Sequence, residues 1–240
     1  MFFSNNIAWY YRIWPWVGFG AAIFMLVLLF ATNYLRDNLN IERWYDPYWL
    51  AWLCTATYLL HNAEEYGIDL TGKRYSFPKS ITSTLAQCGV NDILYVAVNI
   101  PLLWLLSPLA AYIGQKKHSK MMASFTVAIM LINIIPHTFS AIFYEQYNPG
   151  LLTALFLLIP ISVWTYYINF IRTNSNYRAL SISITLGVIY HLFIFFSIQC
   201  LFRSGIASRS KCAFFIFIVS ILYYFLVAES DKLIKPATLP

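Results

Sequence analysis

Charged residues are scarce in this chain of 240 residues: Asp, Glu, Lys and Arg together make up 11% of it, whereas 60% of its positions are hydrophobic. A soluble domain carries charge on about a quarter of its residues, so this chain lacks the polar surface needed to face water. The composition also excludes disordered, collagen-like and coiled-coil proteins, which need high charge, a glycine period or heptads. We therefore expect an integral membrane protein.

Cysteines and known catalytic signatures are also few. The four cysteines form no Cys-x-x-Cys pair and have no zinc-ribbon spacing, so no disulfide scaffold, redox motif or thiolate metal site is indicated. The chain has no Gly-x-Ser-x-Gly elbow, Walker loop, dinucleotide fingerprint or His-Glu-x-x-His string. Its net charge of +6 is spread between apolar runs, which favours membrane lipids as partners and predicts no nucleic-acid binding.

Long apolar runs dominate the chain instead. Windows of roughly 20 residues cross a bilayer core of about 30 Å, and backbone groups in lipid must be satisfied within their own segment, so each window predicts a helix. The seven expected spans are 14–35, 47–66, 90–113, 121–144, 150–170, 179–202 and 212–228. With no internal repeat, residues 1–240 are expected to form a single domain, an all-α polytopic transmembrane helical bundle of about seven helices. We expect it to be a multi-pass protein of the cell (inner) membrane, and a small excess of Lys and Arg favours a cytoplasmic C-terminus.

Ionisable side chains inside the spans are the most informative feature, because a charged group at bilayer depth costs at least about 2.5 kcal/mol. His61, Glu64 and Glu65 lie in the second span, and a rotation of about 100° per residue places them on one helix face. His137 and His191 lie in later spans. A rise of about 1.5 Å per residue puts the three histidines in one layer, so we expect a shared intramembrane site.

Imidazole and carboxylate groups together form a ligand set that Zn²⁺ and Fe²⁺ use, and a bound cation offsets the cost of placing carboxylates together in a low dielectric. We predict a divalent metal ion, zinc or iron, with four ligands: His61, Glu65, His137 and His191. Glu64 is then the spare carboxylate, predicted to be the catalytic general acid or base. The polar residues predicted to orient the ligands are Asn91, Asp92, Asn99 and Asn133. For Asp92, the alternative is an N-cap of the third helix.

Two stretches of the sequence point to a family. Residues 61–65 read His-Asn-Ala-Glu-Glu, the pattern H-x-x-E-E, and Tyr-Asn-Pro-Gly at 147–150 follows His137 and leads into a Leu-rich span. Together these stretches resemble the HXXEE family of small polytopic integral membrane proteins, over about residues 50–170. The resemblance implies an intramembrane polar site and brings no established reaction with it.

Three functions are compatible with this site. The leading hypothesis is a membrane-embedded metal-dependent enzyme, hydrolytic or oxidative, that acts on a lipid-like or hydrophobic small molecule. The alternative is a proton-coupled carrier or channel in which the same His/Glu cluster relays protons and prolines mark broken helices. The third is a non-catalytic scaffold whose polar cluster only fixes helix packing.

Overall fold

The computed structural model of the chain describes residues 9–77, 92–172, 175–202 and 204–234. Within these ranges the structure is helical and has no β-strand beyond one isolated bridge between Ile68 and Arg74, which confirms the expected all-α bundle. In chain order the elements are α1 (Trp9–Ala31), η1 (Arg43–Tyr45), α2 (Pro47–Asn62), η2 (Ala63–Gly67), α3 (Asp92–Asn99), η4 (Ile100–Leu106), α4 (Ser107–Lys117), α5 (Lys120–Ala123), α6 (Phe125–Tyr144), α7 (Leu151–Thr153), η5 (Ala154–Leu158), α8 (Ile159–Tyr166), η6 (Tyr167–Ile171), α9 (Tyr177–Phe196), η7 (Ser197–Phe202) and α10 (Arg209–Ile234). Apart from the 3₁₀ turn η1, the η elements are π-helical segments that continue the neighbouring α-helices.

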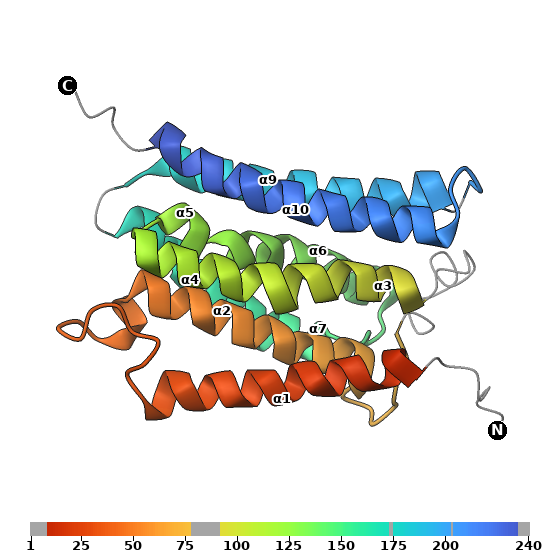
Figure 1. Cartoon of the computed structure of the whole chain (residues 1–240). Helices are drawn as coiled ribbons and strands as arrows, with labels where there is room; N and C mark the ends of the chain where they lie inside the picture. Colours follow the sequence, from red (N-terminus) through yellow and green to blue (C-terminus); the bar gives the residue numbers. More distant parts are fainter. Residues whose placement is uncertain (1–8, 78–91, 173–174, 203, 235–240) are drawn as a thin grey trace.

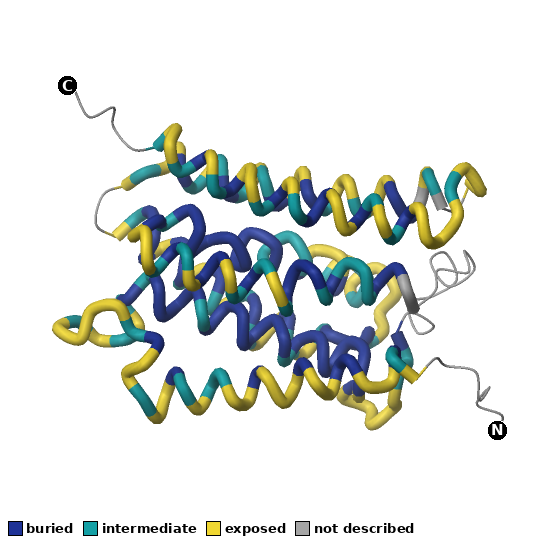
Figure 2. The backbone as a smooth tube through the Cα atoms, in the orientation of Figure 1, coloured by how far each residue is buried: buried dark blue, intermediate teal, exposed yellow. Residues whose placement is uncertain are grey.

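Six helical stretches are long and apolar enough to cross a membrane: Trp9–Ala31, Leu94–Lys117, Lys120–Tyr144, Leu151–Ile171, Tyr177–Phe196 and Arg209–Ile234. They correspond to six of the seven expected spans, so the chain has the helices of a multi-pass membrane protein. The remaining span, 47–66, is the continuous helix formed by α2 and η2. This helix differs from the other six because nearly all of its side chains are buried within the bundle, in contact with α1, α4 and α6 (Figure 2).

The first helix runs from Trp9 to Ala31 rather than over the expected 14–35. Its end is set by Arg43, whose Nη1 donates hydrogen bonds to the carbonyl oxygens of Leu29 and Phe30 at 2.8 and 2.9 Å. A cation on the last carbonyls of a helix satisfies groups that have no partner within the helix. The next long helix begins where Asp46 accepts hydrogen bonds from the first backbone N–H groups of α2.

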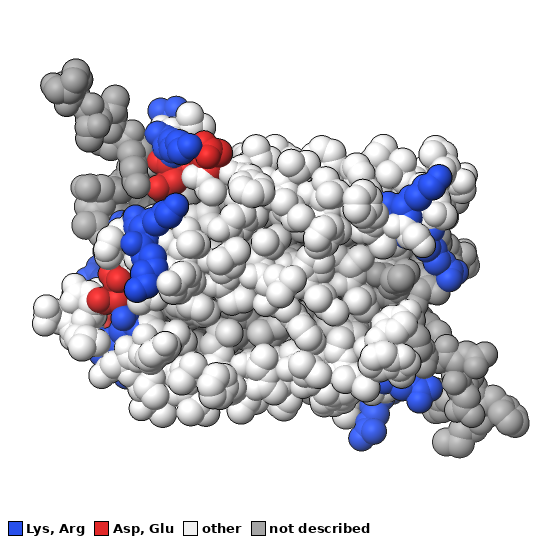
Figure 3. Space-filling model, viewed as in Figure 1, with Lys and Arg blue, Asp and Glu red and all other residues white. Residues whose placement is uncertain are grey.

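The helices lie side by side in one bundle, with α1 along one side and the α9–α10 pair along the opposite side (Figure 1). Where α9 crosses α6, a Cβ atom on Gly187 would lie 2.6 Å from the carbonyl oxygen of Ala128, so the two backbones are in direct contact. Charged side chains gather at the two ends of the bundle and leave the visible middle uncharged (Figure 3). Small residues at helix crossings and an uncharged middle are typical of membrane-spanning bundles.

Candidate metal centre

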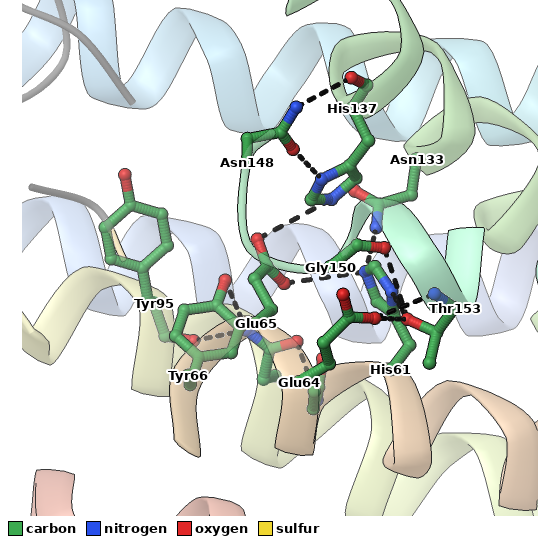
Figure 4. Close-up of polar contacts among 12 residues, drawn as sticks. His61, Glu64, Glu65, Tyr66, Tyr95, Asn133, His137, Asn148, Gly150 and Thr153 are labelled. Carbon is green, nitrogen blue, oxygen red and sulfur yellow. Dashed lines mark hydrogen bonds and ion pairs between the residues drawn. The ribbon is translucent and has the colours of Figure 1, made fainter. Parts of the chain in front are cut away.

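The His-x-x-Glu-Glu segment lies where α2 passes into the π-helical segment η2. His61 is in the last turn of α2, and Glu64 and Glu65 are in η2. All three are buried, with exposed fractions of 0%, 9% and 7%. Single π-helical turns occur frequently at functional sites, because they redirect side chains from the α-helical register. Here Glu64 and Glu65 point to different partners (Figure 4).

Three of the four predicted metal ligands meet. The nearest oxygens of Glu65 lie 3.6 Å from Nε2 of His61 and 3.8 Å from Nε2 of His137. Each of the three residues can offer one ligand atom such that all three atoms lie within 4.8 Å of one another. His137 comes from α6 and is 3% exposed, so the site joins two helices inside the bundle.

Asn148 fixes the tautomer of His137. The amide nitrogen of Asn148 donates to the backbone carbonyl of His137 at 2.9 Å, so its Oδ1 is the atom that meets Nδ1 of the ring at 2.8 Å. Since Oδ1 only accepts, Nδ1 carries the proton. The Nε2 atom of neutral His137 is therefore an acceptor facing a carboxylate oxygen of Glu65, and two acceptors at this distance are attracted to each other only through a cation or proton between them.

A second set of contacts orients His61. The Thr153 hydroxyl contacts Nδ1 of His61 at 2.8 Å and Oε2 of Glu64 at 2.5 Å. Because the hydroxyl proton goes to the carboxylate, Nδ1 of His61 must donate to Thr153, and Nε2 is left with its lone pair. This Nε2 accepts a hydrogen bond from the amide nitrogen of Asn133 at 3.0 Å, a contact that a bound ion would replace. Metal-binding histidines usually donate their second ring N–H in this way, which sets ring orientation.

Glu64 holds the 147–153 segment against η2. Its carboxylate accepts hydrogen bonds from the backbone N–H groups of Leu152 and Thr153, at 3.1 and 2.7 Å, and from the hydroxyl of Tyr147 at 2.8 Å. A carboxylate at the N-terminus of a helix satisfies backbone N–H groups that lack a partner within the helix. Glu64 thus has a clear positioning role, and the catalytic role predicted for it stays a prediction.

Gly150 fills the space beside the two imidazoles. Its φ of +90° is a left-handed conformation that favours glycine, and a Cβ atom there would lie 2.7 Å from Cε1 of His137 and 2.8 Å from Cε1 of His61. The Tyr-Asn-Pro-Gly stretch therefore supplies three contacts to the site, through Tyr147, Asn148 and Gly150. As a sequence motif this stretch indicates only family resemblance, and the signal for its role in the site is the Asn and the Gly within a turn.

The three ligand residues fit a divalent metal ion. Two ligand atoms bound at about 2.1 Å with a tetrahedral angle lie about 3.4 Å apart, close to the 3.6 and 3.8 Å separations from Glu65. Two histidines and one carboxylate form the protein ligand set of several catalytic zinc sites and of non-haem iron sites, in which further coordination positions stay open. His61, Glu65 and His137 are the residues that could hold such an ion.

The other predicted site residues have different positions. His191 lies outside the group of three and bonds through Nδ1 to the carbonyl oxygen of Gly187 at 2.9 Å, so its role as a ligand stays a prediction. Asn99 donates to the backbone carbonyl of Tyr95 and accepts from Asn62. Helix α3 begins at Asp92, whose side chain is not described, and Asn91 lies outside the described residues.

A cavity of about 230 Å³ opens beside the ligand group. Glu65, His137 and Asn133 form its polar side, and His191 also lines it. The remaining lining is mostly aromatic and aliphatic. It comes from α2, η2, α3, η4, α6, α9 and η7 and from the segment after η2, and includes Tyr66, Phe77, Tyr95, Leu102, Tyr190 and Ile198. Apolar cavities with a few convergent polar groups are the usual form of small-molecule sites.

Comparisons with known proteins agree on the segment that contains this site. Residues 52–165 match the family model described as "Protein of unknown function with HXXEE motif". The "Uncharacterized protein YrkK" of Bacillus subtilis (strain 168) is 29% identical over 147 residues, which cover 59% of this chain and 88% of that protein. No solved structure matches the chain. The family match includes His61, Glu65 and His137, whereas His191 lies beyond it.

Proposed function

Residues 52–165 belong to the HXXEE family of proteins of unknown function, and from the site within them we propose that the chain is a membrane-embedded, metal-dependent enzyme acting on a lipid-like or hydrophobic substrate. One observation carries the proposal. Two buried imidazoles with oriented lone pairs and one buried carboxylate converge beside an apolar cavity. We place this multi-pass protein in the cell (inner) membrane.

Each residue has a distinct part in the proposed function. His61, His137 and Glu65 hold the ion, zinc or iron, which would supply Lewis acidity for hydrolysis, or redox chemistry in the case of iron. Asn148 and Thr153 keep the imidazoles in the tautomers whose Nε2 atoms carry the lone pair, and the ion would take the place of the Asn133 amide at Nε2 of His61. Glu64, joined to His61 through the Thr153 hydroxyl, is the proposed general acid or base. The apolar walls exclude water and admit a hydrophobic molecule.

Elemental analysis of detergent-purified protein tests this proposal. We expect about one zinc or iron per chain in the wild type. The ion should be lost in His61→Ala, His137→Ala and the isosteric Glu65→Gln, each of which removes one ligand atom. His118→Ala is the matched control, because the side chain of His118 is 70% exposed and lies outside the group of three. A wild-type protein without metal, or metal content that survives all three ligand variants, would contradict the proposal.

A proton-coupled carrier is the second candidate, favoured by one specific observation. Hydrogen bonds link His61 to Thr153, Thr153 to Glu64 and Glu64 to Tyr147, whose hydroxyl accepts from the exposed backbone N–H of Leu70. Such a chain leads from the buried imidazole toward one end of the bundle. Proton uptake into proteoliposomes by metal-free protein, abolished by Glu64→Gln, would favour the carrier over the enzyme.

A further inference from the structure

We infer that the cavity beside the metal centre recognises a hydroxyl group on a hydrophobic alcohol or phenol, and that Nε2 of His191 accepts the hydrogen bond from that hydroxyl. The inference deepens the proposed function, on which it rests for the idea that the cavity receives the substrate. It assigns His191 a positioning role in place of the ligand role predicted from the sequence.

His191 is held in one tautomer. Its Nδ1 lies 2.9 Å from the backbone carbonyl oxygen of Gly187, and a carbonyl oxygen only accepts, so Nδ1 carries the proton. In the neutral ring, Nε2 is then an acceptor. Among the described residues no side chain donates to this atom. His191 lines the cavity, so a residue whose Nε2 has no partner within the described part of the chain borders an otherwise largely apolar space.

His191 lies at a different height in the bundle from the metal ligands. Gly187 touches Ala128 where α9 crosses α6, so these two residues lie at about the same height in the bundle. His191 is four residues beyond Gly187, or roughly 6 Å along its helix, and His137 is nine residues beyond Ala128, or roughly 13.5 Å. The two histidines therefore differ by roughly 7 Å in height. This separation keeps His191 from completing the ligand group and lets one molecule contact both ends of the cavity.

Such a site admits one class of ligand. An acceptor facing a ligand selects a hydrogen-bond donor, which excludes ketones, esters, ethers and carboxylates as the group bound at Nε2. Glu65, the carboxylate in the lining, is already assigned to the proposed ion, so an ammonium group would leave water for a largely apolar space with no further carboxylate to pair with, at a cost of several kcal/mol. A neutral hydroxyl meets both conditions. The volume of about 230 Å³ exceeds the roughly 150 Å³ apolar cavity that holds benzene, so one substituted ring or a short alkyl segment fits.

A matched pair of probes tests the inference without any reaction. We would measure the binding of 4-propylphenol and of its methyl ether, 4-propylanisole, to the full chain in lipid nanodiscs after metal removal, by equilibrium dialysis against empty nanodiscs. The phenol should bind about fivefold to tenfold more tightly than the ether, the effect of one hydrogen bond. His191→Phe, similar in shape but without an acceptor, should abolish this difference, and His191→Gln should restore part of it through its amide oxygen.

Each outcome is decisive. Equal binding of both probes to the wild type overturns the inference without needing any variant, and so does a preference for the phenol that survives His191→Phe. Loss of bound metal from His191→Phe also overturns it, because it would show that His191 is a ligand. A phenol preference in a wild-type protein that never carries metal would support the inference while contradicting the proposed function, so the two can fail separately.

Discussion

Single atoms decide whether the candidate metal centre can form. Nδ1 of His137 is committed to Asn148 and Nδ1 of His61 to Thr153, so both rings present Nε2 toward Glu65. The absence of one methyl group at Gly150 lets the two rings lie at right angles with centroids 4.9 Å apart. The site therefore depends as much on residues that cannot bind metal as on the three that can.

Gly150→Ala should disrupt the centre. The added Cβ meets both imidazoles at under 3 Å, and the left-handed φ is unfavourable for alanine, so the rings must move apart. We expect metal affinity to fall by at least about tenfold, measured by competition with a chelator. Gly20→Ala is the control, because nothing lies within 4 Å of a Cβ there. Unchanged affinity in Gly150→Ala would show that the rings do not bind the ion.

At the scale of elements, the π-helical segment η2 and the α6–α9 crossing set the shape of the site. In η2 the two adjacent glutamates diverge, Glu64 to the start of α7 and Glu65 to His137 on α6. At the crossing, Gly187 lets α9 approach α6 closely enough for His191 to line the same cavity as His137. In both places, side chains or backbone atoms of one element contact an element that is distant in sequence.

Gly187→Ala should separate α9 from α6. Its Cβ would lie 2.6 Å from the carbonyl oxygen of Ala128, a backbone atom that cannot move away without shifting the helix. Such overpacking costs typically about 1–3 kcal/mol. A lower midpoint of thermal unfolding in detergent is the expected result. Gly20→Ala, which gains helix propensity without a clash, should unfold no earlier than the wild type.

The turn after η2 should lose stability in acid. Asp69 accepts hydrogen bonds from Thr71, Lys73 and Ser76. Burial raises the pKa of Asp69, but these hydrogen bonds outweigh it, and the net pKa is lowered. A carboxyl group whose pKa is lowered on folding stabilises the fold fully above its unfolded pKa, and this stabilisation disappears as the pH falls through the folded pKa.

Hydrogen exchange measures this effect. Protection of the Thr71 and Lys73 amides, corrected for intrinsic exchange, should be constant near neutral pH and fall in strong acid. In Asp69→Asn the same amides should show no such pH dependence, because the side chain no longer titrates. A wild-type protection factor that is constant down to pH values below the ordinary aspartate pKa would refute this assignment.

At the scale of the whole molecule, the charges and the helix count give the topology. Helix α1 begins at one end of the bundle and α10 finishes at the other (Figure 1). A chain that starts and finishes at opposite ends crosses an odd number of times, which agrees with the six long apolar helices and the helix formed by α2 and η2. Among the described residues, Lys and Arg are in small excess at the end that holds the C-terminal end of α10. The positive-inside rule then predicts that this end faces the cytoplasm.

Single cysteines should report this topology. In a variant whose four cysteines are replaced by serine, Lys73→Cys should react with a membrane-impermeant maleimide added outside intact cells, and Lys232→Cys should react only after the membrane is opened. Both lysines are exposed, at opposite ends of the bundle. Five of the long apolar helices lie between these two positions, so labelling of both from outside would mean that at least one of those five does not cross the membrane.

The sequence by itself determined the class of fold and the core of the motif. Apolar windows of membrane length require helices, since nothing else satisfies the backbone in lipid, and the four-residue spacing of His61 and Glu65 brings them together within one helix whatever surrounds it. The resemblance to the HXXEE family was confirmed on the same residues.

The tertiary structure decided which distant residues complete the site. An estimate of depth places His137 and His191 in one layer, but depth says nothing about the rotation of a helix or its distance from its neighbours. The close contact at Gly187, the turn at Gly150 and the π-helical segment η2 fix those quantities. They bring His137 to Glu65 and place His191 elsewhere along the cavity, because contacts between helices depend on the shapes of both surfaces and local spacing describes only one.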